Sequence, residues 1–300
     1  MDDRLVVLVT GCSSGFGRLM IEPLARAGYT VYASLRDSSS RNVDAYRELS
    51  GLSSVHGLPV RAVEIDLTST AQVTSAVAAI EKEAGRIDVV VNNAGIFPYG
   101  ITEAFTVEQL QNALDINVTG VFRMNQAVLP TMRRRQSGLL VHISSVNGRL
   151  APPFFGLYGA SKFAMEALAE TFRYELSQFG VDSVIVEPGP FRTGIQSRSE
   201  EPQDAVRVAE YGQMAMVASQ VFGGLQQMVA DPNLPVDPQL VVDAVLNLIA
   251  TPPGRRPLRT VVGLDFGTGT LNQTTSGVTT QALASLGLAH MENLTSAAQA

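Results

Sequence analysis

The sequence predicts an α/β protein built on a single doubly wound sheet of about seven parallel strands, with helices on both faces. Two observations indicate this fold. Short runs rich in β-branched residues alternate with longer amphipathic or alanine-rich segments, which is the pattern of parallel strands joined by crossover helices. In addition, no internal repeat or low-complexity linker divides the 300 residues. We therefore expect one domain over residues 1–300.

Seven runs have the composition of buried strands and are bounded by turn-forming residues. They occupy 5–10, 30–35, 60–65, 87–92, 138–144, 182–187 and 259–264. Helices are expected between them, at 15–28, 41–51, 69–85, 106–135, 157–180 and 238–251. Gly28 and Gly180 supply the glycine that commonly follows the end of a helix.

Two stretches fall outside this alternation. Residues 194–237 have a helical pattern of their own between Pro202 and Pro232, and we expect them to form a substrate-binding lid. Residues 265–300 are rich in Gly, Thr, Ser and Ala, and we expect them to form a C-terminal extension.

Charge and composition exclude several classes of protein. A net charge of −6 and a pI near 5.2 oppose nucleic-acid binding, which needs a basic surface. The first apolar run, at 5–9, is too short for a signal peptide or a membrane span, so no membrane association is expected. The lone Cys12 cannot form an intramolecular disulfide, which makes a reducing cytoplasm the simplest location. The three histidines lack a ligand spacing, so no metal site is expected.

The segment TGCSSGFG at 10–17 follows the first predicted strand and opens the first predicted helix. In a doubly wound sheet, backbone N–H groups and a helix N-terminus bind a phosphate at this position. Gly11 permits the tight turn, while Gly15 and Gly17 let the backbone approach a pyrophosphate and the helix approach the strand. The spacing is G-x-x-x-G-x-G rather than the common G-x-G-x-x-G, and the alternative is an ordinary glycine-rich turn.

The end of the second predicted strand indicates which dinucleotide binds. An acidic side chain there would bind the ribose hydroxyls of NAD(H), whereas an arginine would accommodate the 2′-phosphate of NADP(H). The chain has Leu35 followed by Arg36, which favours NADP(H) over NAD(H). Asp37 leaves two alternatives, since it can pair with Arg36 or bind the ribose itself.

Tyr158 and Lys162, in the segment LYGASKF, are four residues apart, so a helix would direct both side chains toward one site. A free tyrosine titrates at about pH 10, and a neighbouring ammonium group stabilises the phenolate and lowers its pKa. The pair is therefore predicted to exchange a proton near neutral pH. The Y-x-x-x-K pattern is common by chance, and a purely structural pair is the alternative.

Together these segments resemble the short-chain dehydrogenase/reductase family, in that family's order and spacing, over about residues 4–193. The pairing of TGCSSGFG with VYASLRD more particularly resembles the NADP(H)-linked hydroxysteroid dehydrogenases and carbonyl reductases. The resemblance implies a Rossmann-type fold and hydride transfer between NADP(H) and an apolar ketone, aldehyde or secondary alcohol. The motifs that carry it are the glycine loop, NNAG at 92–95, Asn117 in DINVTG, Ser145 in HISSVNG, YGASK at 158–162 and EPGPFRT at 187–193.

The resemblance also implies a role for each of four catalytic residues. Tyr158 would donate a proton to the carbonyl oxygen during reduction and remove it during oxidation. Ser145 would hold the substrate oxygen, and Lys162 would also hydrogen-bond the nicotinamide ribose. Asn117, within the long helix, would position a water molecule that links Lys162 to solvent.

By the same resemblance, cofactor-binding residues lie in the glycine loop, at the strand ends and at 188–193. Asp66 would contact the adenine amine and Thr193 the nicotinamide carboxamide. Asp66 can alternatively cap the helix that starts near Ser69, and Pro188 with Gly189 can be an ordinary turn. The complete set is Gly11, Ser13, Ser14, Gly15, Phe16, Gly17, Arg36, Asp66, Leu67, Asn93, Ala94, Gly95, Tyr158, Lys162, Pro188, Gly189, Phe191 and Thr193.

The substrate is expected beyond the carboxyl ends of the strands, where open α/β sheets bind ligands. The stretches there are rich in aromatic and apolar residues, so a largely hydrophobic pocket is predicted. Arg149 and Arg192 can either select an acidic group or face solvent. The predicted substrate-binding residues are Phe97, Val146, Phe154, Phe155 and Met214.

Two other functions fit the same motifs: a regulator that senses NADP(H) without turnover, and an epimerase or dehydratase that retains its cofactor. The intact Ser145, Tyr158 and Lys162 favour the oxidoreductase. The long helices at 106–135 and 157–180 resemble the pair through which family members commonly dimerise, so a homodimer or homotetramer is expected.

Overall fold

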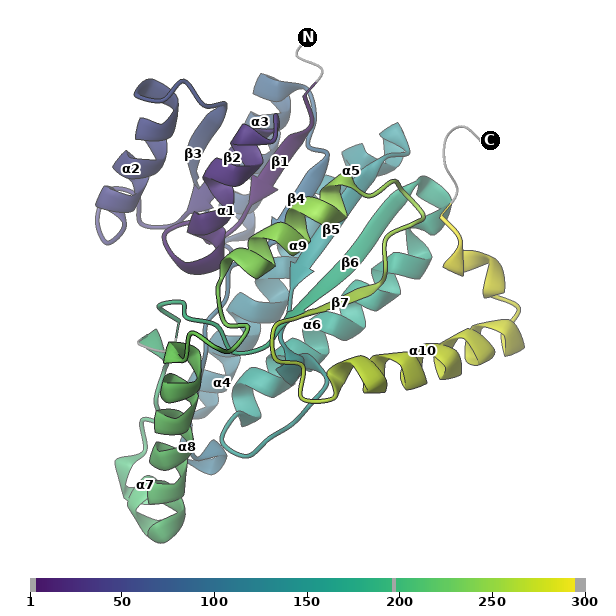
Figure 1. Ribbon diagram of the computed structural model, residues 1–300. Coiled ribbons are helices and arrows are strands. Elements are labelled where there is room, and N and C mark those ends of the chain that lie inside the picture. The colour runs from purple at the N-terminus through teal and green to yellow at the C-terminus, as the bar shows by residue number, and fades with distance from the viewer. Residues whose placement is uncertain (1–3, 196–197, 295–300) are drawn as a thin grey trace.

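The computed structural model describes residues 4–195 and 198–294. In this part of the chain, seven strands form one sheet in the order β3-β2-β1-β4-β5-β6-β7, and every neighbouring pair is parallel (Figure 1). The predicted fold class is confirmed. The strands are β1 (Val6–Val9), β2 (Thr30–Leu35), β3 (Val60–Glu64), β4 (Val89–Asn92), β5 (Gly138–Ile143), β6 (Val181–Pro188) and β7 (Arg259–Val262).

Helices cover both faces of the sheet (Figure 1). They include α1 (Gly15–Arg26), α2 (Val43–Ser54), α3 (Thr70–Ala84), α5 (Gly120–Arg135), α6 (Gly156–Glu175) and α9 (Gln239–Ala250). The core under α1, α2 and α9 contains Val7 and Val9 of β1, whereas the core under α3 and α5 contains Val6 and Leu8. Because side chains of both orientations are buried, central strands such as β1 and β4 read as continuous apolar runs, which is why the sequence pattern predicts them.

The helix predicted over 106–135 is interrupted. α4 (Val107–Leu114) and α5 are joined by a π-helical turn at Asp115–Thr119. Such turns insert an extra residue into a helix and often occur at functional sites. Asn117 lies buried in this turn and bonds both backbone groups of Ile96: the Ile96 N–H donates to Oδ1 at 2.9 Å, and Nδ2 donates to the Ile96 carbonyl at 3.0 Å. We attribute the break to these tertiary hydrogen bonds.

Two other helices differ from the prediction at their ends. α2 runs from Val43 to Ser54 rather than over 41–51. α6 ends at Glu175, and a short 3-10 turn at Ser177–Phe179 completes the segment predicted to be helical to 180. Gly180 follows with φ of +64°, the left-handed conformation that glycine adopts at helix ends.

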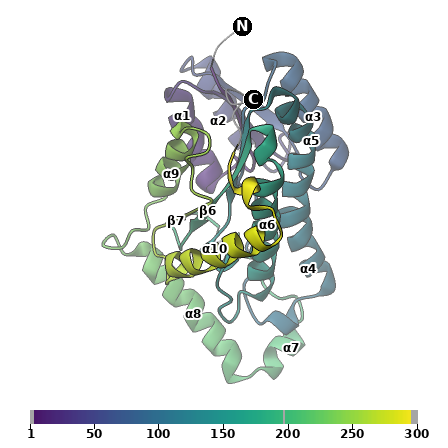
Figure 2. The same cartoon turned by 90° about the vertical axis from the view of Figure 1, so that its right-hand side faces the viewer.

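The 194–237 segment contains two helices, α7 (Ala205–Glu210) and α8 (Gln213–Ala230). Both project beyond one end of the sheet in two perpendicular views (Figure 1, Figure 2). The predicted lid includes residues 196–197, which lie outside the described residues. α8 carries no charged residue. Its exposed apolar side chains include Met214, Met216, Val217 and Val221.

The C-terminal extension contains a long helix, α10 (Thr268–Ser285), and a 3-10 turn at Ala289–Glu292. α10 lies beside β7, and the 3-10 turn that follows it contacts α6 (Figure 2). Residues 295–300, which complete the predicted extension, lie outside the described residues. Within 4–195 and 198–294, none of the helices has both the length and the apolar character that a membrane crossing needs.

Candidate active site

The glycine loop packs closely against the residues that follow β4. A Cβ on Gly11 would lie 2.7 Å from the Cα of Ala94, and Gly11 has φ of +73°, so two independent constraints exclude a side chain. A Cβ on Gly17 would lie 2.4 Å from Nδ2 of Asn93. The Thr10 hydroxyl accepts hydrogen bonds from the N–H groups of Asn93 at 3.0 Å and Ala94 at 3.1 Å. These contacts join the glycine loop to the NNAG segment.

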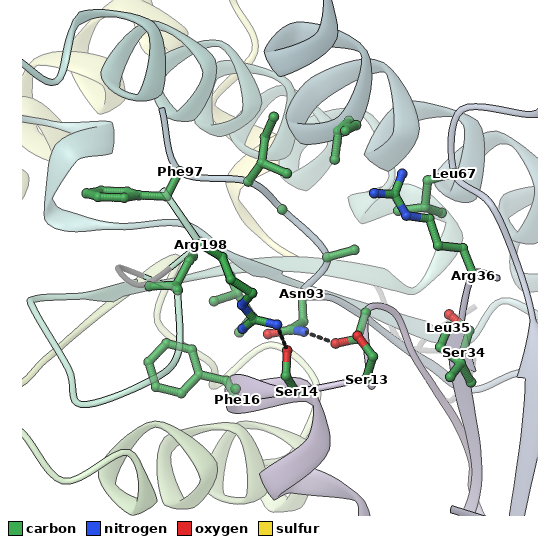
Figure 3. Close-up of a pocket in the computed structure, with 18 of the residues that line it drawn as sticks. Ser13, Ser14, Phe16, Ser34, Leu35, Arg36, Leu67, Asn93, Phe97 and Arg198 are labelled. Atoms are coloured by element: carbon green, nitrogen blue, oxygen red, sulfur yellow. Dashed lines mark hydrogen bonds between the residues drawn. The ribbon is translucent and has the colours of Figure 1, made fainter. Parts of the chain in front are cut away.

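A cavity of about 380 Å³, here called the cofactor cavity, opens at this point (Figure 3). It lies beside β1 and β4, where the strand order reverses and where doubly wound sheets bind nucleotides. It extends to Phe97 and Tyr158. The other predicted residues in its wall are Gly11, Ser13, Ser14, Gly15, Phe16, Arg36, Asp66, Leu67, Asn93, Ala94, Gly95 and Thr193.

Positive charge predominates in the wall of the cofactor cavity. Among the described residues, its Asp, Glu, Lys and Arg side chains are Arg36, Arg41, Asp66 and Arg198. Arg198 donates a hydrogen bond to the hydroxyl of Ser14 in the glycine loop (Figure 3). Sequence reasoning missed Arg41 and Arg198, since neither belongs to a recognised motif. Three guanidinium groups against one carboxylate suit a ligand that carries several phosphates.

The structure distinguishes between alternatives at two aspartates. Asp37 has φ of +53° and its carboxylate lies 3.8 Å from Nε of Arg36, outside the cavity wall. It therefore pairs with Arg36. Asp66 accepts hydrogen bonds from the backbone N–H and the hydroxyl of Thr68 at 2.9 and 2.8 Å, whereas Ser69 caps α3. Asp66 lines the cavity and is not the helix cap.

Three of the predicted catalytic residues meet between β5 and α6. Tyr158 and Lys162 are buried one turn apart on α6. Ser145 follows β5, and its side chain hydrogen-bonds the phenol of Tyr158. The Nζ of Lys162 donates to the backbone carbonyl of Ile143, at the end of β5, at 2.8 Å and lies 5.7 Å from the centre of the Tyr158 ring.

Asn117, in the π-helical turn, lies beside these three catalytic residues. Its Nδ2 donates to the hydroxyl of Ser161, which precedes Lys162 on α6, at 2.9 Å. A Cβ on Gly95 would lie 3.1 Å from Oδ1 of Asn117 and 3.8 Å from Nζ of Lys162. The four residues predicted to be catalytic are therefore brought together, and Gly95 leaves the space between two of them free.

Burial dominates the titration of the tyrosine and the lysine. It raises the pKa of Tyr158 to about 12, and the hydrogen bond with Ser145 opposes this rise. It lowers the pKa of Lys162 to about 8, and the charge of Glu166 opposes this fall. The sequence predicted a lowered pKa for Tyr158. In the structure the pKa of Tyr158 is raised and not lowered, because desolvation of the phenolate outweighs its stabilisation by neighbouring groups.

Several predicted residues lie outside the wall of the cofactor cavity. Phe191 is buried in the core, with its ring 5.5 Å from that of Phe16. Gly189 packs against the backbone of Leu264, which excludes any Cβ. Met214 of α8 lines no part of this cavity and is 49% exposed. The complete set is Gly17, Asn117, Ser145, Val146, Phe154, Phe155, Lys162, Pro188, Gly189, Phe191 and Met214.

The two predicted arginines differ in their surroundings. Arg149 is partly buried and donates to the hydroxyl of Thr275 on α10 at 2.6 Å, so it neither faces solvent nor enters the cofactor cavity. Arg192 is exposed. The apolar cluster that contains Tyr158 instead includes the aromatic side chains of Phe97, Tyr99, Phe154 and Phe155, and Phe97 is in edge contact with the Tyr158 ring.

A buried ionic cluster behind the catalytic residues is a feature that the sequence did not predict. Glu166, one turn after Lys162, accepts a hydrogen bond from the Ser144 hydroxyl at 2.6 Å and pairs with Arg259 at 3.0 Å. Arg259 also lies 3.4 Å from the carboxylate of Glu187, whose pKa is raised by burial and by the charge of Glu166. Asn272 of α10 donates to Glu187. The C-terminal helix is thereby bound to the end of β6.

Comparison with known proteins adds independent information. The family model for short chain dehydrogenases matches residues 5–204. The chain is 36% identical to the 3-ketodihydrosphingosine reductase of Bacteroides thetaiotaomicron, over 63% of this chain and 65% of that protein. It is 34% identical to the estradiol 17-beta-dehydrogenase 1 of Rattus norvegicus, over 83% of this chain and 72% of that protein.

Solved structures show the same fold. A short-chain dehydrogenase from Streptomyces avermitilis has a TM-score of 0.72 and 31% identity, covering 94% of this chain and 99% of that one. A gluconate 5-dehydrogenase from Burkholderia cenocepacia, in complex with NADP and tartrate, has a TM-score of 0.60 and 29% identity. The match covers 65% of this chain and 74% of that one. A short-chain dehydrogenase/reductase from Burkholderia phymatum, in complex with NAD, shares the fold with a TM-score of 0.74 and 23% identity. The match covers 93% of this chain and 96% of that one.

The family model covers the segment that forms the glycine loop, the cofactor cavity and the catalytic cluster, and a solved relative follows the fold over almost the whole chain. This protein therefore belongs to the short-chain dehydrogenase family and is an oxidoreductase.

Proposed function

We propose that the protein is an NADP(H)-dependent reductase that interconverts an apolar ketone or aldehyde with its alcohol, using Tyr158 as the general acid and base. The observation that carries this proposal is the position of Tyr158. It lines the cofactor cavity, hydrogen-bonds Ser145 and belongs to a cluster that contains several aromatic side chains.

The residues of the cofactor cavity fit a nicotinamide dinucleotide. The glycine loop leaves room for a pyrophosphate beside the N-terminus of α1, and Arg198 and Ser14 would bind it there. Arg36 and Arg41 would bind the 2′-phosphate, and Asp66 the adenine. When bound, the cofactor supplies or accepts the hydride. A similar protein binds NADP, and another of the same fold binds NAD, so the preference for NADP(H) rests on the two arginines of this chain.

The protein's own residues handle the proton. With a pKa of about 12, the Tyr158 phenol is protonated near pH 7 and can donate its proton to a carbonyl oxygen. Ser145 would donate a hydrogen bond to the same oxygen and so stabilise its developing charge. The ammonium group of Lys162 would stabilise the phenolate that remains. Asn117, through Ile96 and Ser161, holds the π-helical turn against this cluster.

An apolar substrate is favoured by the side chains around Tyr158. Phe97 lies 4.8 Å from it, ring centre to ring centre, and Phe154 and Phe155 belong to the same cluster. Two similar proteins are named for estradiol and 3-ketodihydrosphingosine, which are both largely hydrocarbon.

NADPH consumption, followed by absorbance with a panel of ketones and aldehydes, tests the proposal. We expect turnover with apolar carbonyl compounds, and its loss in Tyr158→Phe. A protein that binds NADPH but turns over no carbonyl compound would contradict the proposal and favour a regulator. Interconversion of substrates without net NADPH consumption would indicate an epimerase instead.

A further inference from the structure

Beyond the cofactor cavity, the described residues form a second cavity of about 370 Å³, here called the distal cavity. It lies between α7, α8 and the segment after β4, and it shares no lining residue with the cofactor cavity. Most of its wall is apolar, and Glu201 is its one Asp, Glu, Lys or Arg side chain among the described residues. The lining residues are Tyr99, Ile101, Ser199, Glu201, Pro202, Ala205, Val208, Ala215, Ala218, Ser219 and Phe222.

Two stacked rings stand between the cavities. Phe97 lines the cofactor cavity, in edge contact with Tyr158. Tyr99 lines the distal cavity and stacks on Phe97 with 6.2 Å between ring centres and an interplanar angle of 14°. We call Phe97 and Tyr99 the aromatic partition, because they separate Tyr158 from the distal cavity.

The aromatic partition is tied to α8 through Tyr99. Its hydroxyl donates to the backbone carbonyl of Ala218 at 2.7 Å, and its ring packs 4.9 Å from that of Phe222. Its backbone N–H donates to the carbonyl of Glu200 at 3.0 Å. Burial raises the pKa of Tyr99 to about 12, so the phenol remains a hydrogen-bond donor at alkaline pH as well as at neutral pH. The position of Tyr99 and the position of α8 are therefore coupled.

We propose that the distal cavity binds the far end of an elongated apolar substrate, and that Tyr99 is the residue that sets how far a substrate extends from Tyr158. This inference rests on the proposed reductase function. A short carbonyl compound needs only the space beside Tyr158. A long one reaches the distal cavity when the Tyr99 ring turns aside and releases Ala218.

The chemistry of the distal cavity defines the substrate further. Apolar surface in its wall favours a hydrocarbon end, since burial of that end removes it from water. The carboxylate of Glu201 would repel an anionic end, whereas it accepts a neutral or cationic one. The substrate class is therefore a long carbonyl compound or alcohol without a distal carboxylate or phosphate.

Filling the distal cavity tests the proposal. With NADPH, kcat/KM is measured for butanone, for undecanone and for a keto acid as long as undecanone with a distal carboxylate. Ala215→Phe fills the distal cavity, and Met216→Phe adds the same ring at a neighbouring side chain that is 60% exposed and outside its wall. We expect Ala215→Phe to lower kcat/KM for undecanone by about tenfold or more and to leave butanone unchanged. Met216→Phe should affect neither ketone, and the keto acid should be a poor substrate.

Substitution of Tyr99 tests the aromatic partition. Tyr99→Leu removes the ring and should raise kcat/KM for undecanone relative to butanone. Tyr99→Phe keeps the ring and loses only the bond to Ala218, so a smaller change in the same direction is expected. An equal effect on both ketones in Ala215→Phe, or an unchanged ratio in Tyr99→Leu, would overturn the inference.

A binding measurement separates this inference from the proposed function. Undecanone is titrated by calorimetry into Tyr158→Phe, with and without Ala215→Phe, and we expect the second substitution to weaken binding by about tenfold or more. A protein inactive toward every ketone would contradict the proposed function. The titration would still decide whether the distal cavity binds undecanone. Val208→Phe fills the distal cavity from α7 and replaces Ala215→Phe if the latter does not fold.

Discussion

The ammonium group of Lys162 lies one helical turn from the phenol of Tyr158, 5.7 Å from its ring centre, and donates a hydrogen bond to the Ile143 carbonyl. Burial shifts the pKa values of the two groups apart, to about 8 for the lysine and about 12 for the tyrosine. Both shifts favour the uncharged form. The pair is therefore suited to hold one proton on the phenol until a substrate oxygen takes it.

The pH dependence should differ between the two directions of reaction. Reduction needs the protonated phenol, which is present below about pH 12, and the charged Lys162, which is lost as pH rises through about 8. We expect kcat for reduction to be level below pH 8 and to fall above it. Oxidation needs the phenolate, so its kcat should increase with pH. Profiles at saturating substrate in both directions check this, and parallel profiles would contradict it.

Tyr158→Phe should abolish most of the turnover. The substitution keeps the ring and its packing but leaves the substrate oxygen without a proton donor, which costs roughly 100- to 10,000-fold in rate. NADPH affinity, measured by fluorescence titration, should change little. Tyr46→Phe, a partly buried tyrosine on α2 outside the cofactor cavity, is the matched control. Retention of more than about a tenth of wild-type turnover would refute the assignment, given that expected range.

Arg36→Ala should change the choice of cofactor. If Arg36 binds the 2′-phosphate, its loss removes a charge-assisted contact that is worth roughly 10- to 100-fold in affinity. The KM for NADPH should rise by that factor, whereas the KM for NADH should stay nearly constant. Arg47→Ala, an exposed arginine on the neighbouring α2, controls for loss of surface charge. Equal increases for both cofactors would contradict the preference for NADP(H).

Arg198→Ala should weaken both cofactors equally. Arg198 bonds Ser14 of the glycine loop, so we assign it to the pyrophosphate, which NADPH and NADH share. The KM values for the two cofactors should increase together, with little change in their ratio. The comparison with Arg36→Ala therefore separates pyrophosphate binding from 2′-phosphate binding, and a selective effect on NADPH would place Arg198 at the other end of the cavity.

Phe163→Asp should dissociate the predicted oligomer. Phe163 is 41% exposed on α6, and Val107 and Leu110 of α4 are further exposed apolar residues on the helices predicted to dimerise. A carboxylate would be costly to bury in such an interface. Light scattering at micromolar concentration should report a dimer or tetramer for the wild type and a monomer for the variant. Val55→Asp, 76% exposed at the end of α2, should leave the mass unchanged, and a monomeric wild type would contradict the predicted assembly.

The sequence predicts the sheet and the catalytic cluster more accurately than the features that depend on tertiary contacts. Buried parallel strands such as β1 are continuous apolar runs, and motif spacing identifies Tyr158 and Lys162. The π-helical turn depends on hydrogen bonds from Asn117 to Ile96, which no local pattern reveals. Arg198 reaches Ser14 across 184 positions of sequence, so its place in the cofactor cavity follows only from the fold.

The helix α10 illustrates a different limit. Apart from Thr268, none of its residues is fully buried, so it has no apolar stripe that a periodic pattern could reveal. Two specific side-chain contacts contribute to its attachment instead, from Asn272 to Glu187 and from Thr275 to Arg149. In each contact the two residues are more than 80 positions apart in the sequence. A pattern of local spacing cannot pair residues at such a distance.

The attachment of α10 also bears on how the chain folds during synthesis. Glu187 and Arg149 leave the ribosome long before Asn272 and Thr275, so for that interval these partners do not yet exist. Chains grow at about 5–20 residues per second, which makes the interval several seconds or more. During it, β6 presents a carboxylate without its amide donor and an edge that β7 has not yet covered. The nascent protein therefore reaches its final packing only when its last helix emerges.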